Sequence, residues 1–319
     1  MSANLDHPIA ITADGAIPWH KQFNRVPVQP HVEDWAVCSG MGYEVKAIPC
    51  QGVLDGSTVD VDNRRVLVRT DRMDYLDVVS DRYQIVQPRE ILDHMWDISR
   101  EFGFDLETAG VLDEGRKLWV QASTDNSIVL PGNDVIKPYL FMATSFDRSI
   151  ATMARYSMTR VVCQNTLSAA ASEHGQVVKC SHSTALDMNR IKAELGMIEE
   201  TAQEFERNAT ELANADMSPE AAGDFFEQLL QEQAFKWDKD TKRSDRRLHN
   251  KEEAVDFSAK FKSIFGHHLS APGHQDSLWG AVNAVTYHVD HDCSPSTAMF
   301  GAGETLKTTA YNQALALTA

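Results

Sequence analysis

Residues 139–167 read YLFMATSFDRSIATMARYSMTRVVCQNTL, with mainly β-like sequence before them and mainly helical sequence after them. The stretch begins as a nearly continuous apolar run behind Pro138 and is interrupted by a polar turn at 145–149. It then continues through alternating residues as far as Leu167. A strand, a turn and a second strand in this order predict a β-hairpin that leads into a buried segment.

The chain before this hairpin shows short β-like runs separated by turn residues. These runs lie at 43–48, 64–69 and 78–86. The last run ends at Gln87, and Pro88 is a suitable first helical residue because its missing N–H would have no intrahelical partner there. Apolar residues then recur at helical spacing up to Gly103, which predicts a helix over 89–102.

Further strands are expected between this helix and the hairpin. The runs 105–111 and 117–123 flank a turn at 113–115, and 139–145 supplies the next strand. With a second helix expected from about Asn165, the predicted core is helix, strand, strand, strand, helix. We therefore predict an α+β fold with a mostly antiparallel β N-terminal half and a helical C-terminal half.

The helical half contains a regular apolar repeat. Its members are spaced alternately four and three residues apart, at Ile191, Leu195, Ile198, Ala202, Phe205, Ala209 and Leu212. This spacing predicts a heptad seam over 191–212, buried either within the chain or against a second subunit. Ser218 and Pro219 begin a further helix. Three more helices are expected at about 251–265, 276–290 and 296–316.

Three regions follow from these patterns. They are an irregular N-terminal arm over 1–34, an α+β core domain over 35–180 and a helical region over 181–319. Within the last, 236–251 is a mixed-charge, strongly basic segment. It is interpreted as a solvated linker, with a nucleic-acid-binding loop as the alternative.

The composition is that of a globular chain of 319 residues, 43% hydrophobic, with a net charge of −16. No apolar stretch reaches 18 residues and the N-terminus has no signal-peptide pattern, so we expect a soluble protein of the host cell cytoplasm and no membrane contact. The five cysteines lack any C-x-x-C spacing, which argues against disulfides and structural zinc. The acidic balance disfavours non-specific adhesion to nucleic acid but leaves room for a local basic groove.

Signatures of catalysis and of cofactor binding are weak. His267, His268, His274, His288 and His291 lie close together in sequence, but their spacing matches no established zinc motif. Cys163 has the flanks of a packed thiol, and no nucleophile elbow or phosphate loop is present. We therefore predict no catalytic residues, no metal and no cofactor, and favour a non-enzyme. A metal-dependent hydrolase using His288 and Asp292 is the enzymatic alternative.

Arginines with neighbouring aromatic residues are the strongest candidates for binding. They lie around the central hairpin and before the first helix, and they are Arg82, Tyr83, Arg148, Arg155, Tyr156 and Arg160. Guanidinium groups suit phosphate contacts and aromatic rings suit base stacking, so these six residues are predicted to bind nucleic acid. The alternative is that the arginines pair with the surplus of acidic residues on a solvated face.

Four ordered motifs resemble the phage/plasmid-like family called domain of unknown function 932. They are PWH at 18–20, SDRYQIVQP at 80–88, RVVCQNTL at 160–167, and SLWGAVNAVT at 277–286 followed by VDH at 289–291. The resemblance implies a phage or plasmid context, and the family offers no catalytic residues to transfer. At 21–23, Lys-Gln-Phe stands where the commoner pattern has a glycine-containing turn. The predicted element order is also similar to the core of Rad52-like annealing proteins, an analogy of fold alone.

The leading hypothesis is a phage or plasmid DNA-metabolism protein that binds single-stranded DNA without covalent chemistry, with annealing as a further step. It would form a homo-oligomer through the 191–212 seam. The alternative is a phage-encoded protein that binds and neutralises or regulates a host protein through its acidic, helical surface.

Overall fold

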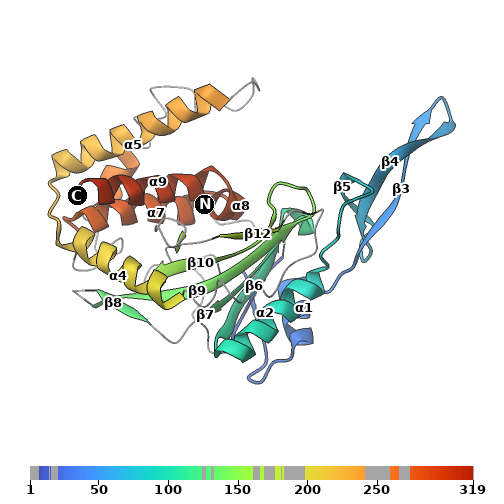
Figure 1. Cartoon of the computed structure of the whole chain (residues 1–319), viewed down its shortest axis with the longest axis horizontal. Helices are drawn as coiled ribbons and strands as arrows, with labels where there is room; N and C mark the ends of the chain where they lie inside the picture. Colours follow the sequence, from blue (N-terminus) through green and yellow to red (C-terminus); the bar gives the residue numbers. More distant parts are fainter. Residues whose placement is uncertain are drawn as a thin grey trace.

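The computed structural model describes residues 7–13, 15, 21–123, 127–130, 133–160, 166–168, 177–180, 182, 198–240, 259–265 and 274–318. Its central element is the predicted hairpin. Strand β9 (Asp134–Ser145) pairs antiparallel with β10 (Thr152–Arg160), from Met153 opposite Ala143 to Arg160 opposite Ile136. The hairpin prediction is therefore confirmed, and the α+β class with it (Figure 1).

The hairpin lies in a 9-stranded sheet whose main path is β11-β10-β9-β7-β6-β1-β2. The other strands on this path are β6 (Asp105–Leu112), β7 (Lys117–Ser123), β1 (Ile9–Ile11), β2 (Phe23–Arg25) and β11 (Thr166–Ser168). Strand β8 (Ile128–Leu130) pairs with β9, and β12 (Val178–Cys180) pairs with β10. The described pairs are antiparallel except β1 with β2, which confirms the antiparallel prediction.

Two expectations about the flanks of this sheet are wrong. No helix starts at the residues directly after 165, because Thr166–Ser168 form β11 and give the backbone of β10 a second partner. Asn165 itself lies outside the described residues. The segment expected to be an irregular arm contributes β1 and β2, and β1 pairs with β6. Only the second difference arises from pairing across a long sequence separation, since Ala10 pairs with Ala109 whereas β11 pairs with the neighbouring β10.

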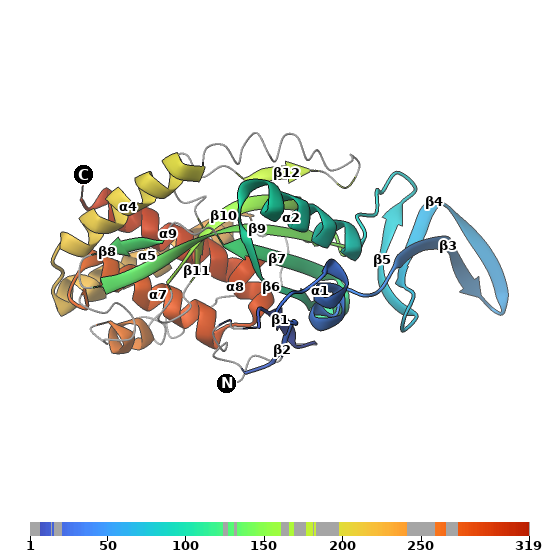
Figure 2. The ribbon, with the colours of Figure 1, turned by 90° about the horizontal axis from the view of Figure 1, so that it is seen from below.

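Helices cover the two faces of the large sheet. Helix α2 (Pro88–Phe102) begins with a capping box and ends at Gly103, whose φ of 71° needs the freedom of glycine. Its Ile91 and Leu92 share a core with Leu118 and Val120 of β7. On the opposite face, Trp119 and Phe141 pack with Phe300 from the C-terminal half. Helix α1 (Val32–Ser39) lies beside α2, and Figures 1 and 2 show these layers from two sides.

The C-terminal half is a bundle of helices. Its elements are α4 (Ile198–Asn214), α5 (Pro219–Asp240), α7 (Leu278–Asp292), α8 (Pro295–Phe300) and α9 (Ala302–Ala316). The last predicted helix is thus divided at Gly301, and residues 259–264 are also helical. The predicted linker 236–251 overlaps the end of α5, and residues 241–251 lie outside the described part of the chain.

The predicted heptad seam is covered by the chain itself where it is described. Phe205, Ala209 and Leu212 are buried. The ring of Phe205 lies 6.1 Å from that of Trp279 in α7 and 5.7 Å from that of Tyr311 in α9. This part of the seam is therefore unavailable to a second subunit, and an assembly of subunits would need another surface. Residues 191–197 lie outside the described residues.

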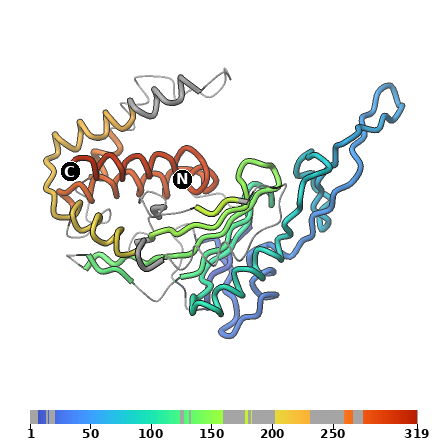
Figure 3. The backbone as a smooth tube through the Cα atoms, in the orientation of Figure 1, coloured from blue at the N-terminus to red at the C-terminus, as the bar shows by residue number. Residues whose placement is uncertain are grey.

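A second sheet projects from the body at the end opposite the helical bundle (Figures 1 and 3). It has the order β3-β4-β5, with β3 (Val45–Leu54), β4 (Ser57–Arg69) and β5 (Asp74–Ser80). We call β3 and β4 the hairpin arm. The predicted run at 78–86 is a strand only as far as Ser80, where the chain turns back towards α2.

Buried polar contacts join the sheet to the bundle. Arg155 of β10 donates to Glu304 of α9 at 2.7 Å and to the carbonyl of Met299 at 3.1 Å, with its guanidinium 5.0 Å from the Phe141 ring centre. Trp279 of α7 donates to the buried Asp134 of β9 at 2.9 Å. Among the described residues, no helix is both long and apolar enough to cross a membrane.

Arg155→Ala should lower the free energy of unfolding by about 3 kcal/mol, because it leaves the partly buried Glu304 carboxylate without its cation. The measurement is urea denaturation. Arg89→Ala is the matched control, since Arg89 is 43% exposed in its ion pairs and its loss should cost about 0.5 kcal/mol. Equal effects of the two variants would contradict a structural role for Arg155.

Candidate nucleic-acid interface

The hairpin arm is fixed to the body at the turn between β6 and β7. Tyr43, just before β3, donates its hydroxyl to the carbonyl of Gly115 at 2.6 Å. Arg69, at the end of β4, donates to the carbonyl of Glu114 at 2.9 Å, and its guanidinium lies 3.9 Å from the Tyr43 ring centre. The arm therefore rests on a short piece of backbone in the large sheet.

That turn has an uncommon backbone conformation. Asp113, Glu114 and Gly115 have φ angles of 53°, 60° and 88°, all in the left-handed region. A Cβ atom added to Gly115 would lie 2.5 Å from Nη1 of Arg69, so only glycine fits at this point. A conformation of this kind persists where surrounding contacts hold it. Here Tyr43 and Arg69 supply such contacts from the arm.

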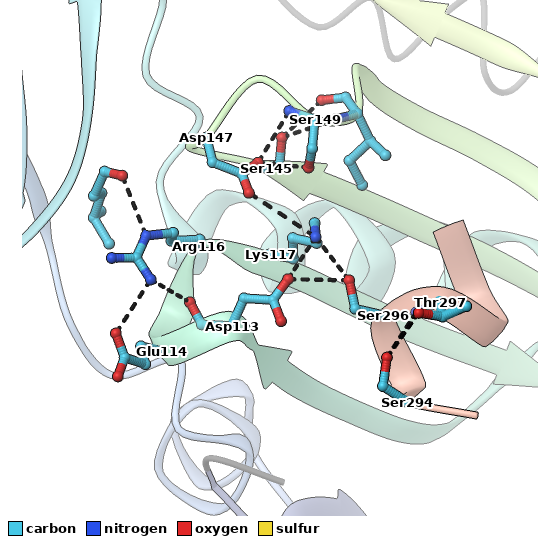
Figure 4. Close-up of polar contacts among 12 residues, drawn as sticks. Asp113, Glu114, Arg116, Lys117, Ser145, Asp147, Ser149, Ser294, Ser296 and Thr297 are labelled. Carbon is cyan, nitrogen blue, oxygen red and sulfur yellow. Dashed lines mark hydrogen bonds and ion pairs between the residues drawn. The ribbon is translucent and has the colours of Figure 1, made fainter. Parts of the chain in front are cut away.

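Lys117 connects the same turn to two other parts of the molecule (Figure 4). Its ammonium group lies 2.5 Å from the Asp113 carboxylate, 2.7 Å from the Ser296 hydroxyl of α8 and 3.9 Å from Asp147 in the β9–β10 turn. Ser296 also donates to Asp113 at 3.0 Å. The side chain of Lys117 is only 11% exposed, so this cluster is an internal junction of two turns and a helix.

The β9–β10 turn is positioned by this junction. The amide of Phe146 donates to the carbonyl of Arg116 at 2.7 Å, and the Ser149 hydroxyl donates to Asp147 at 2.5 Å. Arg148, which lies between Asp147 and Ser149 in this turn, has a φ of 59° and donates to Asp77 of β5 at 2.6 Å. This hydrogen bond raises the pKa of the Arg148 guanidinium. The side chain is still 55% exposed, so the held cation faces solvent.

Three of the six predicted binding residues meet at this end of the body. Arg82 is exposed in the turn after β5. Tyr83 donates its hydroxyl to the carbonyl of Ser145 at 2.9 Å and stacks on His182 with ring centres 4.9 Å apart. Burial raises the pKa of the Tyr83 hydroxyl. Together with Arg148, these residues surround β5.

The other three predicted residues are not part of this group. Arg155 and Tyr156 are neighbours on β10 and therefore point to opposite faces of the sheet. Tyr156 is 6% exposed within the main core, and burial raises its pKa. Burial lowers the pKa of Arg155, which is bonded to Glu304. Of Arg160, the structure describes the backbone at the end of β10, opposite Ile136.

Sequence reasoning missed Tyr75, which is 52% exposed on β5. Its hydroxyl lies 3.5 Å from Asp77, the residue that holds Arg148. Alternation along β5 gave no signal for it, because the β4–β5 register shifts between Asp77 and Tyr75. We call Tyr75, Arg82, Tyr83 and Arg148 the neck cluster.

Acidic residues are concentrated at the other end of the molecule. Residues 198–230, in α4 and the first part of α5, include nine acidic residues and one basic residue. Their net charge of −8 is half of the charge of the whole chain. In Figure 1 these helices lie at the far side from β5. Half of the net negative charge therefore lies away from the neck cluster.

The histidine-rich region was the alternative candidate site. Nδ1 of His288 lies 2.7 Å from the carboxylate of Asp292, and burial lowers the pKa of this histidine. Among the described residues, no group of three His, Cys, Asp or Glu side chains is placed to hold a metal ion. Cys163, the other candidate, lies outside the described residues.

Comparison with known proteins gives one match. The model of the family described as Domain of unknown function (DUF932) matches residues 75–316. This span begins at Tyr75, so it includes the neck cluster and follows the two strands of the hairpin arm. Neither the curated proteins nor the solved structures contain a significant match.

Gly115→Ala should loosen the hairpin arm from the body, because the new methyl group displaces Arg69 and Tyr43. We expect amide hydrogen exchange in β3 and β4 near the body to become at least tenfold faster. Gly56→Ala is the matched control: its φ is 79°, so it carries a similar backbone strain, but no atom lies within 4 Å of the added Cβ. The same exchange pattern in both variants would show that the contacts of Gly115 do not hold the arm.

Proposed function

We propose that this chain, which belongs to the DUF932 family, binds single-stranded DNA non-covalently at the neck cluster and acts in the DNA metabolism of a phage or plasmid. The observation that carries the proposal is the grouping of two exposed arginines and two tyrosines around one strand. Guanidinium groups bind phosphates and aromatic rings stack on bases, which is how proteins hold single strands without reading their sequence.

The length of the cluster suits a short single strand. A β-strand rises about 3.3 Å per residue, so the distance along the chain from Tyr75 to Arg82 is at most about 25 Å. Arg148 and Tyr75 lie near the start of this path because both contact Asp77. Arg82 lies at its far end. A single DNA strand that follows β5 would meet the Tyr75 ring and the Arg148 cation first. It would meet the Arg82 cation a few nucleotides later.

The Arg148 cation is arranged before any ligand arrives. Arg148 uses Nε to bond Asp77, which fixes the side chain while more than half of it stays exposed. Folding has therefore already restricted the conformational freedom of this side chain. Less conformational entropy is lost when DNA binds, which favours affinity. A DNA strand that is bound through its phosphates keeps its base edges free for base pairing. Annealing to a complementary DNA strand would be the further step.

Arg82→Ala combined with Arg148→Ala should weaken binding of a fluorescent single-stranded oligonucleotide at least tenfold at low salt, through loss of two phosphate contacts. The slope of log affinity against log salt should become less steep by about 1.4, since each contact on a single strand contributes about 0.7. Tyr75→Ala should weaken binding about tenfold at unchanged salt slope. Fluorescence anisotropy at several salt concentrations measures both quantities.

Arg100→Ala combined with Arg207→Ala is the matched control, because both residues are exposed and lie on α2 and α4, away from β5. It removes the same charge and should change affinity less than threefold. Absence of any salt-dependent binding by the wild-type chain at low ionic strength would refute the proposal.

The acidic helices favour one second candidate, a phage-encoded protein that binds a host protein. Exposed Glu220, Asp224 and Glu227 lie on α5, and Lys262 is 3.5 Å from the Glu227 carboxylate. A surface with an excess of acidic residues attracts a basic partner and disfavours nucleic acid. This candidate needs the α5 surface and leaves the neck cluster unused.

Glu220→Lys combined with Glu227→Lys should then abolish retention of one host protein by the immobilised chain. The control, Asp97→Lys with Glu101→Lys on α2, makes the same charge change elsewhere and should retain it. Equal retention by both variants would exclude this surface, and the oligonucleotide titration separates the two candidates.

A further inference from the structure

Three arginines without a carboxylate partner lie beside the neck cluster. In the part of the chain that the structure describes, no carboxylate oxygen is within 4.0 Å of Arg64, Arg65 or Arg82. The strand register places Arg64 opposite Ser80 and Arg65 opposite Val79, and Arg82 follows β5. Other arginines are ion-paired, namely Arg69, Arg72, Arg89, Arg116, Arg148 and Arg155. Arg25, Arg100 and Arg207 also lack a carboxylate partner, but they lie singly on β2, α2 and α4.

The charge of this segment differs from that of the whole chain. Residues 64–82 contain five arginines and four aspartates, which gives a net charge of +1 in a chain of −16. Three of the aspartates are already in ion pairs, which are Asp71 with Arg69, Asp74 with Arg72 and Asp77 with Arg148. The unpaired arginines of this segment are therefore available to an anionic ligand.

Arg65 lies on the same face of the small sheet as Arg148. Residues opposite each other in an antiparallel pair share a face, and so do alternate residues of one strand. Arg65 is opposite Val79, which is two residues from Asp77, and Asp77 accepts the hydrogen bond of Arg148. The register is unbroken between these pairs, because its shift comes after Leu67. Diagonal neighbours of this kind are about 7–8 Å apart, within reach of long side chains.

Both cations face solvent at the point where β4 leaves the body. Strand β4 is exposed as far as Arg65, whereas Leu67 and Val79 are buried in the main core. The Arg148 side chain is 55% exposed. Because Arg65 is level with Val79, it lies between Arg148 and Arg82 along β5. It therefore occupies the interval between the two cations of the neck cluster.

We propose that Arg65 contacts a phosphate of the bound DNA strand, between the phosphates contacted by Arg148 and Arg82. This inference rests on the proposed function, and it defines the ligand as a single strand whose backbone is continuous along β5. The three cations are level with positions 77, 79 and 82, so the two intervals along β5 are at most about 7 Å and 10 Å. Such a row of guanidinium groups suits an extended phosphate backbone.

The composition of the arm limits this path. Residues 50–62, beyond Arg64 on the arm, contain three aspartates and no basic residue. They also include the exposed Leu54 and Val59. An acidic and apolar segment disfavours a polyanion, so the DNA strand should follow β5 and not the outer part of the arm.

Arg65→Ala should weaken binding of a fluorescent single-stranded oligonucleotide about fivefold at low salt, because one phosphate contact is lost. The slope of log affinity against log salt should become less steep by about 0.7. Arg64→Ala is the matched control, since it removes the same charge from the neighbouring exposed residue, which alternation places on the opposite face of β4. Fluorescence anisotropy should show less than a twofold change for this control.

Arg65→Lys separates the charge from the shape of the side chain, and it should keep the wild-type salt slope. Both alanine variants should unfold at the wild-type urea concentration, because both arginines are exposed and have no ion pair. Equal affinities of the Arg65→Ala and Arg64→Ala variants would overturn this inference. If Arg82→Ala with Arg148→Ala still weakens binding in that case, the proposed function stands without it. A wild-type chain that shows no salt-dependent binding would overturn both.

Discussion

The left-handed turn at Asp113, Glu114 and Gly115 is the constraint on which the arrangement of this molecule depends. The backbone carbonyls of this turn accept hydrogen bonds from Tyr43 and Arg69, where the arm joins the body. The Asp113 carboxylate accepts hydrogen bonds from Lys117 and Ser296. One short connection thus fixes the arm, the β9–β10 turn and α8. Three successive residues in the left-handed region raise the free energy of the folded backbone. The contacts that stabilise this conformation come from the arm and α8 as well as from Lys117.

Local patterns were sufficient for elements whose stability is local. The hairpin β9–β10, helix α2 and strands β6 and β7 follow from alternation, from Pro88 and from Gly103, because turns and caps act within a few residues. Strand β1 depends on β6, a partner distant in sequence. The heptad spacing likewise predicts that Phe205 is buried against an apolar partner. It does not identify that partner, which is the pair of helices α7 and α9.

The candidate site was predicted in part for a related reason. Arg82, Tyr83 and Arg148 lie in turns, where polar and cationic side chains reach solvent. Arg155 and Tyr156 lie in β10 of a sheet covered on both faces, and whether such residues are exposed depends on what packs above them. Tyr75 was missed because its exposure results from the projection of β5 beyond the body, which is a property of the tertiary fold.

Three surfaces emerge with different chemistry: the acidic helices, the neck cluster and the apolar arm. The central claim is that single-stranded DNA lies along β5, and photocrosslinking tests it most directly. An oligonucleotide carrying 4-thiothymidine, irradiated with the wild-type chain and mapped by peptide mass spectrometry, should crosslink at Tyr75 or Tyr83. Crosslinks confined to α4 and α5, or none at low salt, would contradict the account.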